Sequence, residues 1–336
     1  MKPQKLICRD NRCLGEGKFE QVGIAQWGGW RTGVKKARPK SALSAKLCSG
    51  DTAKRQLEVS LMSKTAPAIR PITPRIGALI EGLDLTRPLD DEQFEWLHQA
   101  WMDHLVLFFE GPRLTSFEHL ALGGRFGELH IHPAAPFVGD NPALMRIHTD
   151  ASSKRNNGEG WHSDVSADEE PPMASILQIH ETPSSGGDTV WANMYQAFEE
   201  LSDPMQRMLE GLEAVHAANY DGFYGDHAPQ RANPEATHPV VRTHPVTGRP
   251  VLFVNSGFTK RIKGLTAGES QALLGYLFEH VKNPNFHCRF SWQPNALAIW
   301  DNRCTQHMAV WDYFPETRSG VRVTVKGDKP FFKGSS

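Results

Sequence analysis

The sequence predicts a mostly β fold with flanking helices. Past residue 170 the chain carries many short apolar runs separated by turn residues, which is typical of a sandwich, a jelly roll or a barrel. Helical periodicity is confined to a few stretches, several of which follow a capping pattern. No internal repeat of solenoid length is evident, so a closed β domain is favoured over a repeat architecture.

The first ordered elements are expected after a Pro-rich entry. A short strand is predicted around 76–80, and Asp90 is the expected cap of a helix that is followed by the buried strand LVLFF (105–109). Thr115 and Glu118 form a capping box before a second helix, which is expected to end near Gly123. The apolar face of the first helix, spaced three and four residues apart, is Phe94, Leu97 and Trp101.

The β-rich part begins after residue 170 and contains two further helices. The predicted strands are 174–179, 188–192, 213–217, 238–243, 250–255, 287–292, 296–300 and 320–326. Pro204 introduces a helix whose core face is Met205, Met208, Leu209 and Leu212. A Thr266/Glu269 capping box introduces the other, whose core face is Leu274, Leu277, Phe278 and Val281.

Residues 1–62 differ in kind from the remainder, 63–336. They carry 13 Lys or Arg against 5 Asp or Glu, whereas the remainder carries 24 against 33, and they show no sustained apolar period. We expect a poorly ordered extension rather than part of the core, and Met62 is a candidate start of the protein. A targeting peptide or a nucleic-acid arm is the alternative, although the stretch has no apolar signal-peptide core.

Composition limits the classes of partner. The net charge is -1 and 22% of the residues are charged, so no global attraction to nucleic acid or anionic membrane is expected. No run approaches the roughly 18 apolar residues of a membrane span. The near-neutral charge therefore favours a small-molecule ligand. The five cysteines are odd in number and scattered, which favours a reducing cytoplasm.

His162 and Asp164, in GEGWHSDVS, are the first candidate metal ligands. On an extended chain they point the same way, although such a pair is expected by chance about once in a chain of this composition. His307 follows the predicted strand 296–300 and is a third ligand if the chain returns on an adjacent strand. Two histidines and one carboxylate suit non-haem Fe(II) with open positions, or zinc in a hydrolase.

Arg318 and Arg322 follow the third ligand at even spacing and share one strand face. Arginine holds a carboxylate in two parallel hydrogen bonds, so one arginine near open Fe(II) fits a chelating dicarboxylate and a second suggests another anion. Solvated strand charges are the plainer alternative.

Long segments of the chain resemble a known enzyme family. They are WHSDVSADEEPPMASILQIHETPSSGGDTVW, HPVVRTHPVTGRPVLFVNSGFTKRI and IWDNRCTQHMAVWDYFPETRSGVRVTVKGDKPF, together with GLDLTRPLDDEQF and RFGELHIHP. These closely resemble the taurine/2-oxoglutarate dioxygenase (TauD/TfdA-like) family of Fe(II)/2-oxoglutarate-dependent dioxygenases, from about residue 72 to residue 331.

The resemblance implies a double-stranded β-helix, or jelly roll, that carries Fe(II) on His162, Asp164 and His307. It implies that Arg318, helped by Thr189, binds 2-oxoglutarate. By family chemistry, 2-oxoglutarate and O2 are converted to succinate and CO2 while a substrate C–H bond is hydroxylated. Hydroxylation beside a sulfonate gives a product that breaks down to an aldehyde and sulfite. The family often forms dimers or tetramers, so a homo-oligomer is expected.

The resemblance also bears on the substrate. His132 and Arg322 match the family's sulfonate-binding residues, so an anionic substrate is expected. Ala135 and Gly158 stand where taurine enzymes carry a tyrosine and an asparagine for the amine, so taurine is expected to bind poorly.

An enlarged apolar wall is expected around the anion-binding residues. The candidate pocket residues are Ala135, Gly158, Val165, Tyr220, Phe223 and Phe258. An alkyl- or arylsulfonate other than taurine is preferred, with an alkyl sulfate ester or an aryloxyalkanoate as alternatives. A zinc hydrolase and an inactive binding protein on the same fold are the more distant hypotheses.

Overall fold

The computed structural model describes residues 66–132, 135–156, 158–219 and 233–334. The predicted extension, 1–62, lies outside these residues and stays a prediction.

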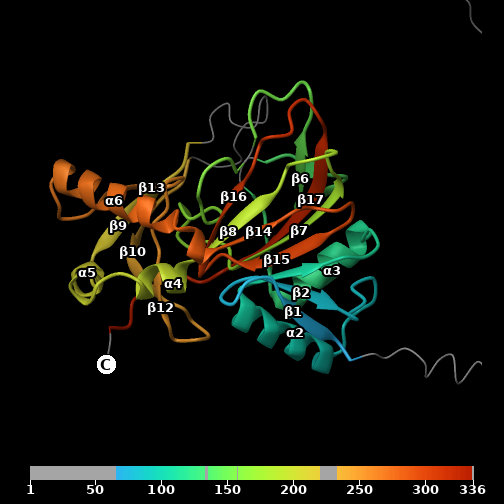
Figure 1. Cartoon of the computed structure of the whole chain (residues 1–336), viewed down its shortest axis with the longest axis horizontal. Coiled ribbons are helices and arrows are strands. Elements are labelled where there is room, and N and C mark those ends of the chain that lie inside the picture. Colours follow the sequence, from blue (N-terminus) through green and yellow to red (C-terminus); the bar gives the residue numbers. More distant parts are fainter. Residues whose placement is uncertain (1–65, 133–134, 157, 220–232, 335–336) are drawn as a thin grey trace, which may run out of the picture. The chain divides into compact units, whose positions relative to one another are not determined.

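A nine-stranded sheet forms the largest part of the described fold (Figure 1). Its order is β1-β2-β3-β15-β7-β17-β6-β5, with β4 paired to β17, and all its pairs are antiparallel except β2 with β3. The strands are β1 (Ala68–Pro71), β2 (Ala78–Glu81), β3 (Val106–Phe109), β4 (Leu129–His130), β5 (Phe137–Val138), β6 (Asn141–Thr149), β7 (Ala174–Glu181), β15 (Leu297–Asp301) and β17 (Arg318–Val325).

A three-stranded sheet, ordered β14-β8-β16, packs against one face of the large sheet. Its strands are β8 (Thr189–Asn193), β14 (His287–Phe290) and β16 (Thr305–Ala309). Trp191 of β8 meets Phe108 of β3 and Trp300 of β15 edge-on, with ring centroids 5.2 and 5.8 Å apart. Two antiparallel sheets with a shared core confirm the predicted mostly β class, here a jelly roll.

Successive side chains along a strand of the large sheet point to opposite faces, and each face packs into a different hydrophobic core. In β3, Val106 and Phe108 belong to the core shared with the small sheet, whereas Leu107 and Phe109 belong to the core beneath the helices. Helix α2 (Asp91–His104) contributes Leu97 and Trp101 to that second core, and α3 (Ser116–Phe126) covers it alongside. Because both faces are buried, such strands appear in the sequence as continuous apolar runs.

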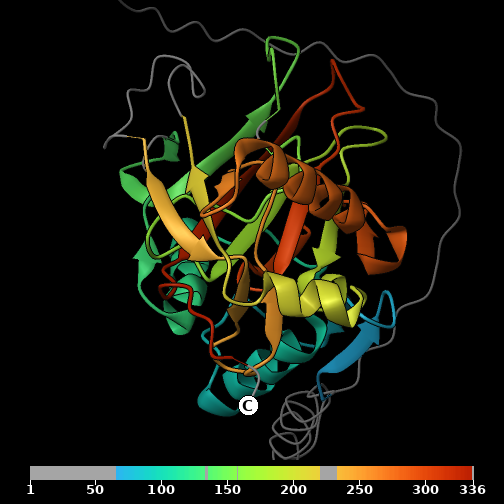
Figure 2. The ribbon, with the colours of Figure 1, turned by 90° about the vertical axis from the view of Figure 1, so that its left-hand side faces the viewer.

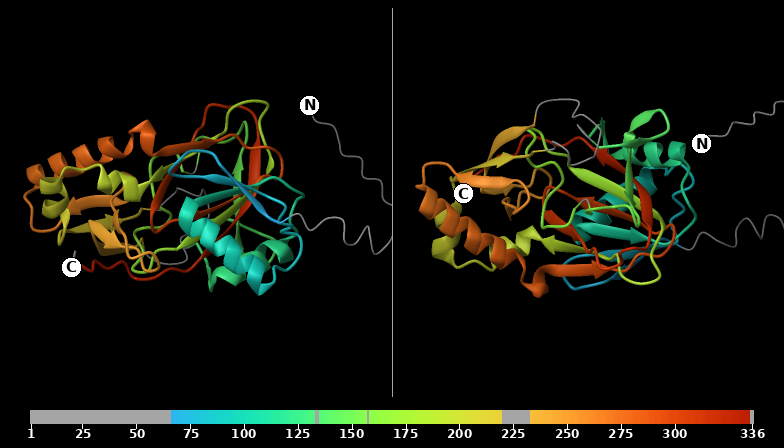
Figure 3. Two further views of the ribbon diagram at one scale, coloured as in Figure 1. Left: turned by 60° about the horizontal axis from the view of Figure 1, so that its bottom comes forward. Right: turned by 90° about the horizontal axis from the view of Figure 1, so that it is seen from above.

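The remaining elements extend the fold beyond the small sheet. They are α4 (Met194–Glu199), α5 (Asp203–Leu209), β9 (Glu213–Ala217), β10 (Glu235–Pro239), β11 (Val241–Thr243), β12 (Pro250–Leu252), β13 (Thr259–Ile262), α6 (Ala267–Val281) and the 3-10 turn η1 (Pro284–Phe286). Strands β10-β9-β13 form one sheet and β11-β12 another. Helix α6, the long orange helix of Figure 2 and Figure 3, lies beside β13 and away from α2 and α3.

Local chemistry accounts for the helix starts that the sequence predicted. Thr115 and Thr266 each accept a hydrogen bond from the backbone of the glutamate three residues later, and each glutamate side chain bonds back to the threonine backbone. Asp90 and Gln93 form a similar box before α2, which confirms the predicted cap. The first two helices run on to residues 104 and 126, the latter slightly beyond its expected end.

Some elements differ from the prediction because packing overrides periodicity. Strand β6 was not predicted, since Asn, Pro, Arg and His interrupt its apolar residues. The apolar residues assigned to the helix after Pro204 are not all helical, because α5 ends at Leu209 and Leu212 lies beyond it. Met208 is 47% exposed and is therefore not a core residue. The predicted strand 238–243 is divided into β10 and β11.

No helix in the described ranges has the length and apolar character needed to cross a bilayer.

Buried histidines make stability depend on pH. Burial lowers the pKa of His119 to about 4, against roughly 6.5 in an unfolded chain. Between these values the unfolded chain binds a proton that the folded chain excludes, so the free energy of unfolding falls as the pH falls. His119 alone is expected to remove about 2 kcal/mol between pH 7 and pH 5.

We predict that His119→Gln reduces this pH dependence while its amide still donates to the Ile176 carbonyl. Urea unfolding at pH 7, 6 and 5 measures the change for the wild type and the variant. Equal losses of stability in the two proteins would contradict a neutral buried histidine at this position.

Candidate metal and cosubstrate site

Backbone pairing brings the two candidate histidine ligands together. His162 lies outside the named strands but forms an antiparallel bridge with His307 of β16. The His162 N–H donates to the His307 carbonyl at 3.1 Å, and the His307 N–H donates to the His162 carbonyl at 2.8 Å. The strand return expected for His307 is therefore present, and its partner is the segment that carries His162.

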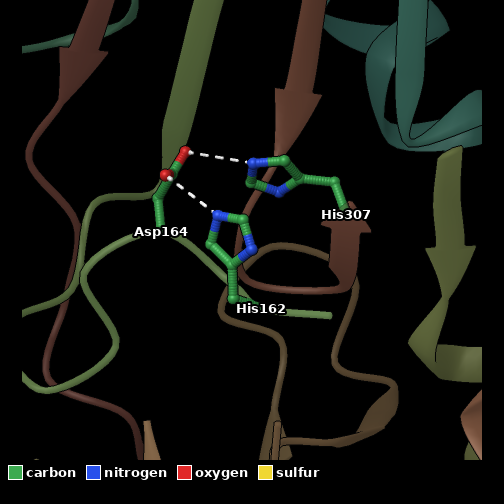
Figure 4. A group of neighbouring side chains, drawn as sticks. All are labelled: His162, Asp164 and His307. Carbon is green, nitrogen blue, oxygen red and sulfur yellow. Dashed lines mark ion pairs between the residues drawn. The ribbon is translucent and has the colours of Figure 1, made fainter. Parts of the chain in front are cut away.

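The three predicted ligands face one another (Figure 4). His162 Nε2 lies 3.9 Å from Asp164 Oδ1, and His307 Nε2 lies 3.9 Å from Asp164 Oδ2. One ligand atom from each of the three residues lies within 4.8 Å of the other two. Two imidazoles and one carboxylate at this spacing fit a single divalent ion that retains open positions.

Electrostatics favour the protonation states that a metal requires. Burial lowers the pKa of His162 and of His307, so both rings are neutral near pH 7. Burial acts to raise the pKa of Asp164, but Arg322 and the two nearby histidines outweigh it and hold the pKa below its usual range. The site therefore presents two neutral imidazoles and an ionised carboxylate.

Each oxygen of the Asp164 carboxylate accepts a short hydrogen bond. Arg322 Nη1 donates to Oδ1 at 2.6 Å, and the Ser175 hydroxyl donates to Oδ2 at 2.6 Å. Arg322 Nη2 lies 3.1 Å from the sulfur of Met145, and its Nε has no hydrogen-bond partner among the described residues. Arg322, expected to bind an anion, is thus also the cation that balances Asp164.

Arg318 and Thr189 form a second polar group in the same cavity. Arg318 Nη2 lies 3.4 Å from the Thr189 hydroxyl, which also accepts a hydrogen bond from the Trp292 indole at 3.0 Å. Arg318 is 4% exposed and makes no ion pair with a carboxylate within the described ranges. Burial lowers its pKa, although arginine stays charged at neutral pH. A buried cation without a carboxylate partner is suited to an anionic ligand.

A cavity of about 500 Å³ contains both groups. Its walls include the three candidate ligands, Thr189, Arg318, and the predicted anion-binding residues His132 and Arg322. They also include the predicted pocket residues Gly158, Val165 and Phe258. Ala135 is not among the described lining residues, and its backbone N–H donates to His132 Nδ1 at 3.0 Å. Tyr220 and Phe223 lie outside the described residues and stay predictions.

Gly158 adjoins the candidate ligand His162. Its φ is +93°, a conformation that favours glycine, and a Cβ placed there would lie 3.3 Å from His162 Cε1. Its carbonyl accepts the Ala309 N–H at 2.8 Å, so the backbone is also held in place. A larger residue at position 158 would meet the imidazole directly.

A second cluster with metal-ligand chemistry, His244, Asp301 and Cys304, is already satisfied internally. Asp301 accepts two hydrogen bonds from the Arg303 guanidinium and one from His244 Nε2. His244 Nδ1 accepts backbone N–H groups from the following turn. Both nitrogens of His244 and both oxygens of Asp301 already make hydrogen bonds within the protein. These hydrogen bonds stabilise the turn between β15 and β16.

Sequence reasoning missed three residues that contact the site: Met145, Ser175 and Asn302. Ser175 donates to Asp164, and Asn302 in turn donates to Ser175 at 3.0 Å. A serine inside the predicted buried strand 174–179 was an available signal, because a buried hydroxyl needs a partner. The pairing of Met145 with Arg322 depends on β6, which the sequence did not predict.

Taken together, the structure is a jelly roll with a candidate metal site, His162, Asp164 and His307, in the same cavity as the buried Arg318. The family model described as "Taurine catabolism dioxygenase TauD, TfdA family" matches residues 68–324. The chain belongs to this family of 2-oxoglutarate-dependent dioxygenases, which are oxidoreductases.

Relatives and solved structures agree with this assignment. An alpha-ketoglutarate-dependent sulfate ester dioxygenase from Pseudomonas putida is 38% identical, covering 78% of this chain and 90% of its own. An alpha-ketoglutarate-dependent sulfonate dioxygenase from Saccharomyces cerevisiae is 32% identical, covering 78% and 67%. The crystal structure of a taurine dioxygenase from Burkholderia xenovorans has a TM-score of 0.70 and 37% identity, covering 79% and 92%.

We predict that Asp164→Asn weakens metal binding by at least about 100-fold, because it removes the anionic ligand and leaves Arg322 unbalanced. Titration with Co(II), followed by its visible absorption, measures the affinity. Asp103→Asn on α2 removes one negative charge away from the site and should bind Co(II) like the wild type. Unchanged affinity in the Asp164 variant would exclude this carboxylate as a ligand.

Proposed function

We propose that this protein is an Fe(II)- and 2-oxoglutarate-dependent dioxygenase that hydroxylates a small organic sulfonate other than taurine. The observation that carries the proposal is the pair of buried arginines on β17, Arg318 and Arg322, which line one cavity with the candidate metal ligands. Their Cα atoms are separated by four residues of strand, or roughly 13 Å. That separation supports two anion sites, one for the cosubstrate and one for the substrate.

Fe(II) is the ion that this set of residues suits best. His162, Asp164 and His307 leave coordination positions for a chelating cosubstrate and dioxygen, which a hydrolytic zinc site has no reason to provide. Bound there, Fe(II) with 2-oxoglutarate and O2 supplies the oxidising chemistry. His162, Asp164 and His307 would hold the ion, and Arg318 and Arg322 would hold the cosubstrate and the substrate in the same cavity.

Arg318 and Thr189 are the proposed binding residues for the distal carboxylate of 2-oxoglutarate. The Arg318 guanidinium has a donor, Nε, that is buried and lacks a partner among the described residues. A carboxylate is the planar group that such a guanidinium holds with two hydrogen bonds. Trp292 donates to the Thr189 oxygen, so the Thr189 hydroxyl hydrogen is left to donate to the ligand.

Arg322 and His132 are the proposed binding residues for the substrate anion. Arg322 pairs with Asp164 through Nη1, while its Nε is without a partner in the described part of the chain. Burial and the charge of Arg322 lower the pKa of His132 to about 3, so His132 is neutral and contributes hydrogen bonding rather than charge. Arg322, whose charge is shared with Asp164, and the neutral His132 would therefore bind a singly charged sulfonate mainly through hydrogen bonds.

The surroundings of Gly158 support a substrate other than taurine. Glycine offers no side-chain oxygen to an ammonium group, and its positive φ and contact with His162 leave little room for an asparagine. Leu177, Val165 and Phe258 add apolar surface to the cavity. An alkyl or aryl group fits these walls better than a charged amine does.

The proposed reaction is balanced as follows. The substrate R–CH2–SO3⁻, 2-oxoglutarate and O2 give R–CH(OH)–SO3⁻, succinate and CO2. The hydroxysulfonate then loses its C–S bond to give the aldehyde R–CHO and hydrogen sulfite.

A sulfate ester is the second candidate substrate. The similarity to the Pseudomonas putida sulfate ester dioxygenase favours it, and a sulfate ester offers Arg322 the same single negative charge. Hydroxylation at the carbon next to the ester oxygen would release an aldehyde and sulfate instead of sulfite. The expected homo-oligomer and cytoplasmic location stay predictions.

We predict that the protein forms succinate with Fe(II), 2-oxoglutarate and an alkyl- or arylsulfonate, at several times its rate without substrate. A panel of sulfonates, sulfate esters and aryloxyalkanoates tests this, with taurine included as a weak substrate. Sulfite release identifies a sulfonate substrate and sulfate release identifies a sulfate ester. Stimulation by aryloxyalkanoates alone would reject both sulfur-containing classes.

We predict that Arg318→Lys raises the KM for 2-oxoglutarate by about 10- to 100-fold, because lysine cannot form the paired hydrogen bonds of a guanidinium. Initial rates across a range of 2-oxoglutarate concentrations measure the effect. Arg261→Lys on β13, an exposed position, is the matched control and should keep the wild-type KM. A KM unchanged in the Arg318 variant would place the cosubstrate elsewhere.

A further inference from the structure

A chain of three hydrogen bonds runs through the buried interior to the candidate ligand Asp164. The Trp300 indole N–H donates to Asn302 Oδ1 at 2.9 Å, and Asn302 Nδ2 donates to the Ser175 hydroxyl at 3.0 Å. The Ser175 hydroxyl then donates to Asp164 Oδ2 at 2.6 Å. Ser175 is 0% exposed and Asn302 is 1% exposed, so water cannot replace either group easily.

The Trp300 indole decides which group donates in each of these three hydrogen bonds. An indole N–H can only donate, so it selects the oxygen of the Asn302 amide and turns the NH2 group toward Ser175. Since Ser175 accepts from that NH2 group, its single hydroxyl hydrogen is free for Asp164. The order of these hydrogen bonds therefore makes Ser175 the donor and Asp164 the acceptor.

Asn302 is itself held by the segments that carry the candidate metal ligands. It lies in the turn between β15 and β16, five residues before His307. Its carbonyl accepts the Ser163 hydroxyl at 2.6 Å, and its N–H donates to the Met173 carbonyl at 2.8 Å. Arg303 and His244 hold the neighbouring Asp301 by three side-chain hydrogen bonds, which stiffens the same turn.

Ser175 and Arg322 bond to opposite oxygens of the Asp164 carboxylate. Arg322 is a full charge with several donors, so without an opposing donor it would turn the carboxylate toward itself. The Ser175 hydroxyl bonds to Oδ2, the oxygen nearer to His307, and thereby resists that rotation.

We propose that Ser175 and Asn302 are positioning residues that keep the Asp164 carboxylate directed between His162 and His307 for metal binding. This inference rests on the proposed metal site. Neither residue belongs to the cluster of candidate ligands, so their effect would be on the orientation of Asp164. Groups that orient metal ligands typically change metal affinity by 10- to 100-fold when they are removed.

The test is Co(II) affinity of the full chain, measured by titration without 2-oxoglutarate or substrate. Ser175→Ala should weaken Co(II) binding by about 10- to 100-fold and alter the visible Co(II) spectrum, while Ser175→Thr, which keeps a hydroxyl, should restore most of the affinity. Ser270→Ala is the control, because Ser270 is a buried serine in α6 that accepts the Ile262 N–H at 2.8 Å. It should lose stability but keep the wild-type affinity and spectrum.

A double-mutant cycle tests whether Asn302 and Ser175 act through the same series of hydrogen bonds or act independently. Asn302→Leu removes the donor to Ser175 and also the acceptor of the Asp164 backbone N–H, which lies 3.4 Å from Asn302 Oδ1. We expect it to weaken Co(II) binding, and we expect the double variant to lose less than the sum of the two single effects. Wild-type affinity and spectrum in Ser175→Ala would overturn the inference, and additive effects would overturn the role of Asn302. If the wild type does not bind Co(II), the proposed metal site fails as well. If Asn302→Leu does not fold, the two Ser175 variants decide the inference alone.

Discussion

The buried negative charge of Asp164 is the constraint on which the candidate site depends. An isolated carboxylate in a protein interior is unstable by several kcal/mol, and here Arg322 balances its charge, Ser175 donates a hydrogen bond to it and two imidazoles face it. Arg322 on β17 and His307 on β16 are far from Asp164 in the sequence, whereas Ser175 on β7 and His162 are near to it. The jelly roll satisfies this charge by bringing the four segments to one place.

Both sheets contribute residues to the candidate site. Strands β7 and β17 of the large sheet are neighbours and carry Ser175, Arg318 and Arg322, while β16 of the small sheet carries His307. The hydrophobic core between the sheets fixes their separation, because interiors are close-packed and deform little. The spacing between His307 and the two arginines is therefore set by core packing, and the backbone bridge to His307 ties the segment of His162 to the small sheet.

Much of the fold could be predicted because local chemistry and periodicity agreed. The capping boxes at Thr115 and Thr266 marked true helix starts, and the apolar runs of β3, β7 and β15 marked buried strands. Prediction failed where tertiary packing decides the outcome. Strand β6 has a broken apolar pattern and is stabilised by pairing with β17, and α5 ends before Leu212 because the chain turns there.

The sequence alone determined the chemistry available to the site: which side chains are able to bind a metal, which arginines share a strand face, and which family the motifs resemble. Tertiary structure alone decided that Arg322 balances Asp164 and that Ser175 and Asn302 lie beside the same carboxylate. It also decided that His244 hydrogen-bonds to Asp301. The physical reason is that residue type fixes what a group can donate, accept or bind. Only the packing of distant strands fixes which partner it meets.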